Sequence, residues 1–332
     1  MLKLGIIGTN SISHQFIAAA TLSKKYQLSA VYSRRLETAQ AFVKDYENVD
    51  CFTDFKAFFK ADFDVIYIAS PNSLHFEQAS LALKAGKHTI VEKPIASTPS
   101  ELAQLRQLAQ ENQVFLFEAA RNYQENAFQI IRDFLADQTI IGGHFTYAKY
   151  SSKMGDLLAG KEPNVFSADF SGGALMDLGV YTLYAAIGLI GKPNTAHYTA
   201  VQLPNTVDIN GIGQLIYDTF MVTVQAGKNL TSNLPSEIYT TDGTLTLNDC
   251  QDIRSAIFTA CDGTETALPI QAAPDRMLEE AQAFAQAIME QDQSSVNHWL
   301  DDAENVHQTL YTMRQSANIT FKADIHEGNI SN

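Results

Sequence analysis

The chain has 332 residues, of which 45% are hydrophobic and 18% charged, as expected for a globular protein of about two domains with a hydrophobic core. Its net charge is −14 and no run of Lys or Arg exceeds two residues, so neither nucleic acid nor an anionic membrane is expected as a partner. The three cysteines form no CxxC pair, and neither a disulfide framework nor a metal site is expected.

The N-terminal residues indicate the cellular location of the protein. A predicted strand begins almost at Met1, which leaves no room for a signal peptide. We identify no apolar stretch that approaches the ~20 residues needed to span a bilayer. The chain is therefore expected to be cytoplasmic.

Apolar runs alternate with helical periodicity over the first 120 residues. Strands are predicted at 2–8, 27–33, 49–52, 64–70, 88–94 and 114–119, and helices at 12–23, 36–46, 54–60, 73–85 and from 98 or 100 to 111. The strands are apolar throughout, as in sheets that are buried on both faces. This alternation predicts an α/β fold, with a doubly wound parallel Rossmann sheet for dinucleotide binding over residues 1–119.

The pattern changes after residue 120. Helices are predicted at 126–135, 174–190, 275–290 and 301–316, and strands at 143–151, 195–203, 209–218, 220–226, 236–241, 244–247, 253–260 and 264–269. Asp242-Gly243 indicates a hairpin turn. Residues 120–332 are therefore expected to form an α+β substrate-binding domain with a large, mostly antiparallel open sheet. One uncovered face of that sheet would serve for oligomerisation, as a dimer or a tetramer.

The first strand runs into a turn that could hold a dinucleotide. A phosphate needs backbone N–H groups and the positive end of a helix dipole. Gly8 supplies the tight turn, Asn10 stands where a second glycine is usual, and Ser13 replaces a third. We assign cofactor binding to Gly8, Thr9, Asn10, Ser11 and Ile12. Asn tolerates left-handed backbone, but the residues alone leave open whether Asn10 and Ser13 touch the pyrophosphate, or whether this is an ordinary strand-to-helix turn.

The second predicted strand ends in Ser33 and Arg34 rather than in an acidic residue. A carboxylate here would accept from the ribose 2′-OH of NAD, whereas Ser33 can donate to a 2′-phosphate and Arg34 can neutralise it. The position favours NADP(H), with NAD(H) as the alternative. A solvated start of the next helix would also account for Arg34.

Two further groups of residues follow strands of the same predicted sheet. The carboxyl ends of such strands are where open α/β sheets bind ligands. The candidates there are Ser70, Pro71, Asn72 and His75 after the fourth strand, and Glu92 and Lys93 at the end of the fifth. Because the residue before proline is restricted, Lys93 has a defined local geometry.

Asp177 and Tyr181 are four residues apart in a predicted helix and therefore share one face. A cation near a tyrosine stabilises the phenolate, so a Lys93–Tyr181 pair suits proton transfer during hydride transfer. Amphipathic packing would also explain Tyr181. In the loop at 154–170, Asp169 could contact a substrate hydroxyl or could simply be solvated.

The motifs GIIGTN, AVYSRR, SPNSLH, EKP, EAAR and GGALMDLGVY come in the order and spacing of the Gfo/Idh/MocA family, which the chain resembles up to about residue 195. Tyrosine in the last motif resembles the glucose–fructose oxidoreductase, xylose dehydrogenase and dihydrodiol dehydrogenase branch. The resemblance implies that Lys93 and Tyr181 are catalytic and that Asp177 orients substrate. It also implies that Asn72 and His75 line the nicotinamide end. Arg121 resembles a family position near the active-site cleft, and the alternative is that it only braces the two domains.

These observations predict an NADP(H)-preferring dehydrogenase or reductase that acts on the CH–OH group of a sugar, polyol or related carbonyl compound. Two alternatives stay open: a non-catalytic cofactor- or sugar-sensing protein of the same fold, and a non-redox enzyme that uses tightly bound NAD transiently. The complete set of Lys93, Asp177 and Tyr181 favours the oxidoreductase.

Overall fold

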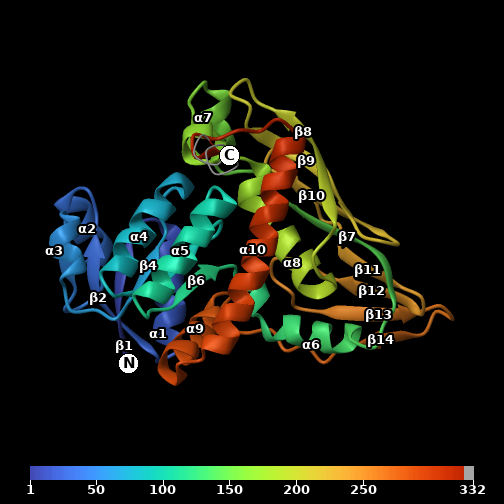
Figure 1. Cartoon of the computed structure of the whole chain (residues 1–332), viewed down its shortest axis with the longest axis horizontal. Coiled ribbons are helices and arrows are strands. Elements are labelled where there is room, and N and C mark those ends of the chain that lie inside the picture. Colours follow the sequence, from blue (N-terminus) through green and yellow to red (C-terminus); the bar gives the residue numbers. More distant parts are fainter. Residues whose placement is uncertain (325–332) are drawn as a thin grey trace. The chain divides into compact units, whose positions relative to one another are not determined.

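A computed structural model describes residues 1–324 of the chain. The residues fall into two compact units (Figure 1). The first comprises Met1–Ala96, Ser100–Ala119 and Ala273–Asp301, and the second comprises Ser97–Pro99, Ala120–Ala272 and residues 302–324. Each unit is built around its own sheet.

The first unit contains a six-stranded sheet in which every pair of neighbours is parallel. Its order is β3-β2-β1-β4-β5-β6, and its strands are β1 (Leu2–Ile7), β2 (Tyr26–Tyr32), β3 (Asp50–Phe52), β4 (Val65–Ile68), β5 (His88–Glu92) and β6 (Leu116–Ala119). The order reverses between β1 and β4, so the turns after these strands meet at the switch point. The predicted doubly wound sheet is confirmed.

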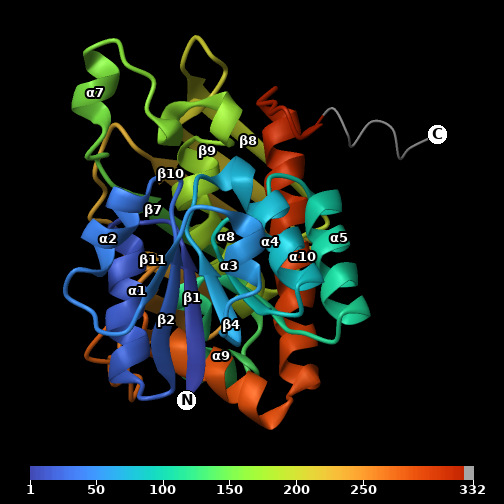
Figure 2. The same ribbon diagram turned by 90° about the vertical axis from the view of Figure 1, so that its left-hand side faces the viewer.

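Helices flank this sheet, with α1 and α2 toward the left of Figure 2 and α4 and α5 toward the right. The helices are α1 (Ser11–Leu22), α2 (Leu36–Val43), α3 (Phe55–Phe59), α4 (His75–Lys84), α5 (Pro99–Glu111) and, from far along the chain, α9 (Leu278–Glu290). The hydroxyl of Tyr26 donates to the carbonyl of Ala281 in α9 at 2.8 Å, and Phe117 stacks on Phe284 at 4.6 Å. This compact unit thus includes a late helix that the expected division at 119 and 120 assigns to the second domain.

The second unit contains an eight-stranded sheet of order β14-β13-β12-β11-β7-β10-β9-β8, whose strands run from green to orange in Figure 1. Its strands are β7 (Ile140–Ala148), β8 (Thr195–Gln202), β9 (Asp208–Ile216), β10 (Met221–Gly227), β11 (Ser236–Thr240), β12 (Gly243–Leu247), β13 (Ala256–Ala260) and β14 (Glu265–Ala267). All neighbours are antiparallel except β7 and β10. The predicted mostly antiparallel sheet is confirmed, and Thr240 pairs with Gly243 across the expected hairpin.

One face of this sheet is covered by helix α8 (Val180–Ile190), which packs against β7 and β10. The other helices of the unit are α6 (Asn126–Leu135), α7 (Met154–Leu158) and the later residues of α10 (Gln293–Ser316). Helix α10 begins earlier than the predicted residue 301. Its first residues are polar, but Val296, Leu300 and Ala303 are buried at helical spacing and extend the helix backwards.

The segment Ala168–Ile190 corrects one expectation. It contains an 18-residue window of mean hydropathy 1.5, long and apolar enough by composition to cross a membrane, although no such stretch was expected. In the structure 83% of that window is buried inside the protein, as in the core helix of a globular domain. The high apolar content therefore reflects a helix with protein on all sides.

Candidate functional site

The turn after β1 has the geometry that a bound phosphate group needs. Gly8 has φ +105°, and a Cβ at this position would lie 2.5 Å from the carbonyl oxygen of Ala69. Only glycine allows strands β1 and β4 to end this close together. The turn delivers the chain to the N-terminus of the 12-residue helix α1, and the N-terminus of a helix is a place where an anion can bind.

Asn10 and Ser13 shape this turn from within. Asn10 caps helix α1, with its side-chain oxygen accepting from the N–H of Ser13 at 3.1 Å and its amide donating to Ala69 O at 2.7 Å. Its φ of −107° is extended rather than left-handed, so the tolerance of asparagine for left-handed backbone is not what selects it. Ser13 is fully buried and its hydroxyl donates to Gly8 O at 2.7 Å. The two residues replace glycines by bonding the turn to itself.

The end of β2 lies beside this turn, because Tyr32 pairs with Ile7 of β1. The next residue, Ser33, is half-buried and its N–H donates to Phe52 O at 3.0 Å. Arg34 follows and is exposed, and Arg35 precedes helix α2. The strand end therefore carries a hydroxyl and a guanidinium where an NAD site carries a carboxylate.

His75 joins the loop after β4 to the loop after β5. His75 is 1% exposed, with Nδ1 2.9 Å from Pro94 O and Nε2 2.8 Å from Ser70 O. Burial lowers the pKa of His75, and the two carbonyl groups oppose that shift. Asn72 begins a short 3₁₀ turn and, like Pro71, is half-buried. The ring of His75 thus lies beneath the candidate site and fixes two of its loops.

Lys93 follows β5 on a loop held from both sides. Its peptide bond to Pro94 is cis, and its side chain is half-buried. Glu92 is buried and accepts a hydrogen bond from the hydroxyl of Tyr67. The N–H of Ile95 donates to Glu118 Oε1 at 3.1 Å. Sequence reasoning gave no role to Glu118, although a carboxylate at the end of the apolar run VFLFEA was a signal for one.

In the second unit, Tyr181 lies in the first turn of α8 and is 6% exposed. The ring of Tyr147 on β7 packs against it edge-on at 5.6 Å, and the guanidinium carbon of Arg121 lies 5.3 Å from the centre of its ring. The amide of Asn122 donates to its backbone carbonyl at 3.2 Å. The phenol is therefore enclosed by aromatic and cationic groups rather than by water.

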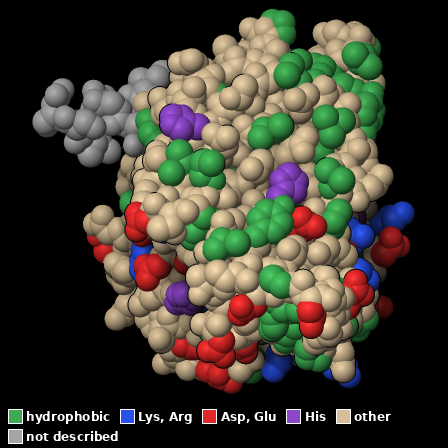
Figure 3. Space-filling view, turned by 90° about the vertical axis from the view of Figure 1, so that its right-hand side faces the viewer, with side chains coloured by type: hydrophobic (Ala, Val, Ile, Leu, Met, Phe, Trp, Pro, Cys, Tyr) green, Lys and Arg blue, Asp and Glu red, His purple; other side chains and the backbone are tan. Residues whose placement is uncertain are grey.

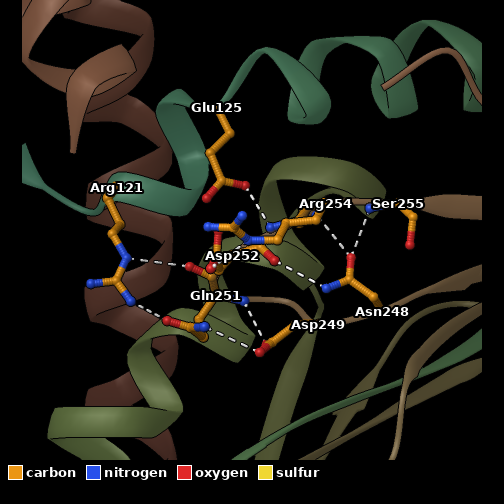
Figure 4. A network of polar contacts seen from close by, with 9 residues as sticks. Arg121, Glu125, Asn248, Asp249, Gln251, Asp252, Arg254 and Ser255 are labelled. Atoms are coloured by element: carbon orange, nitrogen blue, oxygen red, sulfur yellow. Dashed lines mark hydrogen bonds and ion pairs between the residues drawn. The ribbon is translucent and has the colours of Figure 1, made fainter. Parts of the chain in front are cut away.

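Arg121 is anchored in a polar network (Figure 4). Its Nε lies 3.4 Å from the carbonyl oxygen of Gln251 and its Nη2 donates to the Gln251 side chain. Gln251 in turn donates to Asp249 at 3.1 Å, and Glu125 accepts from the N–H of Ile253 at 2.8 Å. The structure thus uses Arg121 to hold the 248–255 loop and to place a cation beside Tyr181.

Asp177 lies in a π-helical segment, Leu175–Gly179, that runs directly into α8. Its carboxylate is 31% exposed and forms an ion pair with the buried ammonium of Lys228. The predicted α-helix is thus widened at the residue expected to orient substrate, as π-bulges often are at functional sites. Sequence reasoning missed Lys228. A lysine two residues after the predicted strand 220–226 was the available signal.

Asp169 is placed differently from the other candidates. It lies on the 3₁₀ turn Ala168–Phe170, its side chain is 61% exposed, and it pairs with Lys322 at 2.8 Å. An exposed ion pair of this kind contributes little energy. The solvated alternative for Asp169 therefore fits its surroundings.

The first unit thus offers a glycine turn at a helix N-terminus, a strand end without a carboxylate, and a half-buried lysine at one sheet edge. This arrangement defines a dinucleotide-binding protein of the Rossmann fold. Residues 2–120 match the family model of the oxidoreductase family with an NAD-binding Rossmann fold, and residues 137–246 match the GFO/IDH/MocA C-terminal domain. The chain belongs to the Gfo/Idh/MocA oxidoreductase family.

Known proteins resemble the chain along its whole length. It is 37% identical over 327 residues to the oxidoreductase YgjR of Escherichia coli (strain K12), with 98% of this chain and 99% of that protein covered. It is 32% identical over 326 residues to scyllo-inositol 2-dehydrogenase (NADP+) of Bacillus subtilis (strain 168), with the same coverage of 98% and 99%. A 3-ketoreductase from Actinomadura kijaniata, solved with NADP and TDP-benzene, superposes with a TM-score of 0.82 at 22% identity, covering 95% of this chain and 97% of that one.

These comparisons confirm the expected family, the expected enzyme class and a nicotinamide dinucleotide as the cofactor. The individual site residues stay predictions. The residues of the first unit fit that cofactor. The free N–H groups of α1 suit its pyrophosphate, and the buried hydroxyl of Ser70 has no hydrogen-bond partner within residues 1–324.

Proposed function

We propose that the protein transfers hydride between NADP(H) and the CH–OH carbon of a neutral sugar or polyol. Two observations support the cofactor preference. Strand β2 ends in Ser33 and Arg34, with no carboxylate to repel a 2′-phosphate. The Bacillus subtilis relative is named as an NADP+ enzyme, and it acts on scyllo-inositol.

In this proposal the turn from Gly8 to Ile12 holds the pyrophosphate, and the loops at Ser70–Asn72 and Glu92–Lys93 line the nicotinamide end. When bound, the cofactor accepts or supplies the hydride. Tyr181 takes the hydroxyl proton during oxidation and returns it during reduction. Lys93 stabilises the negative charge that develops on the reacting oxygen, and Asp177 accepts a hydrogen bond from a neighbouring substrate hydroxyl.

The environment of Tyr181 carries this proposal. Tyr181 is 6% exposed and therefore largely shielded from water, and the Arg121 guanidinium carbon, 5.3 Å from the centre of its ring, offers a cation to stabilise its phenolate. Asp177 precedes it by one helical turn and exposes part of its carboxylate. An acid–base group beside a hydrogen-bond acceptor suits a substrate with adjacent hydroxyls.

The open face of the large sheet supports an oligomer, which we propose as a dimer or a tetramer. The outward residues of β8, β9 and β10 include no Lys, Arg, Asp or Glu within the described strands and combine Thr and Gln with exposed Val201, Ile212 and Met221. Figure 3 shows hydrophobic side chains and histidines on this side, with acidic groups gathered toward its lower edge. An uncharged face of this kind suits a second copy.

We also propose a cytoplasmic location and two functional domains, residues 1–119 for the dinucleotide and residues 120–332 for substrate and oligomerisation. Helix α9 comes later in the sequence but belongs structurally with the first domain, because it contacts that unit.

The test of the function begins with oxidation of scyllo-inositol and D-xylose by the full chain, followed by absorbance of the reduced nicotinamide. Tyr181→Phe should lower kcat at least ~100-fold and leave the Kd for NADPH unchanged. Tyr184→Phe is the matched control, because Tyr184 is a second buried tyrosine of α8 that packs on Tyr123. Full activity in Tyr181→Phe would mean that another group accepts the hydroxyl proton of the substrate. NADPH binding without turnover of any neutral polyol would favour the sensing protein.

A further inference from the structure

Lys228 is a buried cation beside the candidate substrate site. It follows β10 directly, and its backbone is fixed on both sides. Its N–H donates to Ile209 O at 2.8 Å, and its carbonyl accepts from the N–H of Ser151 at 2.8 Å. The side chain is 3% exposed, and its ammonium lies 5.5 Å from the centre of the Phe166 ring. A buried lysine needs a partner for its charge.

The partner is Asp177, and the two ends of the ion pair differ in exposure. The ammonium of Lys228 is enclosed, whereas the carboxylate of Asp177 is 31% exposed. The lysine therefore holds the carboxylate from the protein side and leaves part of it open to solvent. A charge-assisted hydrogen bond of this kind fixes both the orientation and the ionised form of the acid.

A second carboxylate secures the same segment. Asp208 on β9 is 1% exposed, and its Oδ2 accepts from the N–H of Leu175 at 2.7 Å and from the hydroxyl of Tyr198 at 2.8 Å. Leu175 begins the π-helical segment that carries Asp177. Burial raises the pKa of Asp208, and the bonds from Tyr198 and Leu175 and the charge of Lys228 oppose that rise. The buried ammonium of Lys228 thus forms an ion pair with Asp177 and also acts on the charge of Asp208, which binds the start of the same π-helical segment.

We propose that Lys228 is a positioning residue for the substrate pocket. It holds Asp177 as an ionised acceptor, and the pocket therefore selects substrates that present neutral hydroxyl groups to Asp177. This inference depends on the proposed function, in which Asp177 contacts the substrate. Its consequence concerns charge. Because the ammonium is already neutralised by Asp177, this side of the pocket offers no net positive charge to an acidic sugar.

Binding to the NADPH-saturated full chain tests the selectivity without turnover. The probes are D-xylose and D-glucuronate, which share a ring but differ by a carboxylate. Wild type should bind D-xylose more tightly. Lys228→Met should weaken D-xylose binding at least ~10-fold and leave the Kd for NADPH unchanged, because Asp177 loses the charge that orients it. Asp177→Asn should narrow the preference for D-xylose over D-glucuronate ~10-fold, because it frees the charge of Lys228.

Two controls separate positioning from general damage. Lys149→Met removes the same charge from an exposed residue just after the neighbouring strand β7, and should change no sugar affinity. The double variant Asp177→Asn/Lys228→Met should lose the gain for D-glucuronate that Asp177→Asn shows. Unchanged D-xylose affinity in Lys228→Met, or an equal loss in Lys149→Met, would overturn the proposal.

Thermal unfolding of wild type, Lys228→Met, Asp177→Asn and the double variant gives a measurement that needs no substrate. Asp177→Asn leaves the buried charge of Lys228 without Asp177, so the double variant should melt above Asp177→Asn. Additive losses would overturn the role of Lys228. Failure of wild type to bind either sugar would count against the proposed substrate class, and the unfolding cycle would then decide for or against the ion pair by itself.

Discussion

The guanidinium of Arg121 lies over the ring of Tyr181, with its central carbon 5.3 Å from the ring centre. The same guanidinium bonds the backbone and the side chain of Gln251, so the cation is held in place rather than mobile. A cation beside a phenol favours the phenolate, which is the form that accepts a proton from substrate.

Arg121→Gln should therefore lower kcat for polyol oxidation about tenfold near neutral pH and move the rise of the rate to higher pH. The pH–rate profile is the measurement. Arg132→Gln is the matched control, because the Arg132 guanidinium carbon lies 5.5 Å from the ring centre of Tyr123, a tyrosine with no proposed part in catalysis. A profile that shifts equally in both variants would show that Arg121 acts through stability alone.

Arg34→Ala should raise the Kd for NADPH at least ~10-fold and leave the Kd for NADH nearly unchanged, because only NADP(H) carries the 2′-phosphate that Arg34 would neutralise. Fluorescence titration of both reduced cofactors measures this. Arg35→Ala removes the same charge from the next exposed residue and should have a smaller effect. Equal affinity of the unmodified protein for the two cofactors would contradict the role given to Arg34.

The sequence predicted the sheets well because their signal is local. Strands such as Val65–Ile68 are continuous apolar runs between turn residues, and Gly8 stands where β1 must turn sharply. The π-widening at Asp177 left no such signal, because the segment ALMDLGVY has ordinary helical periodicity. The residues that bind this segment are distant in the sequence, Asp208 on β9 and Lys228 after β10, so local periodicity does not reveal them.

The candidate site shows the same contrast between local sequence signals and contacts from distant residues. Motifs pointed to Tyr181 and Lys93, but the groups that hold them come from other parts of the chain, as Glu118 does for the loop of Lys93. Spacing along the sequence says nothing of such contacts. The reason expected for Asn10 was also wrong. Asparagine was expected there for its tolerance of left-handed backbone, but its side-chain amide caps helix α1 and bonds to Ala69.

Ile212→Glu should dissociate the proposed oligomer, because Ile212 is exposed on the outward face of β9 between uncharged neighbours on β8 and β10. A charge buried against a second copy costs several kcal/mol. Sedimentation velocity should show a protomer where wild type shows a dimer or a tetramer. Leu22→Glu is the control, since Leu22 and Ile212 are both 51% exposed. A wild-type protein that sediments as a monomer would contradict the proposal that this sheet face is an oligomer interface.

His75 should make the protein less stable in mild acid. Burial lowers its pKa below the ordinary value of 6.5, so as pH falls through 6.5 the unfolded chain binds a proton that the folded chain does not. The free energy of unfolding therefore falls below pH 6.5 until the pKa of the folded state is reached. His88, whose pKa is lowered in the same way by burial, adds to the effect.

Urea unfolding of wild type and His75→Gln at a series of pH values between about 7 and 5 measures this contribution. Glutamine cannot titrate, so the variant should start less stable at neutral pH, where it loses a buried ring between Ser70 and Pro94, and should then lose less stability on acidification. His75→Gln/His88→Gln should flatten the slope further. Parallel slopes in wild type and His75→Gln would mean that His75 binds its proton equally well in the folded and unfolded chains, with its two carbonyl partners fully offsetting the cost of burial.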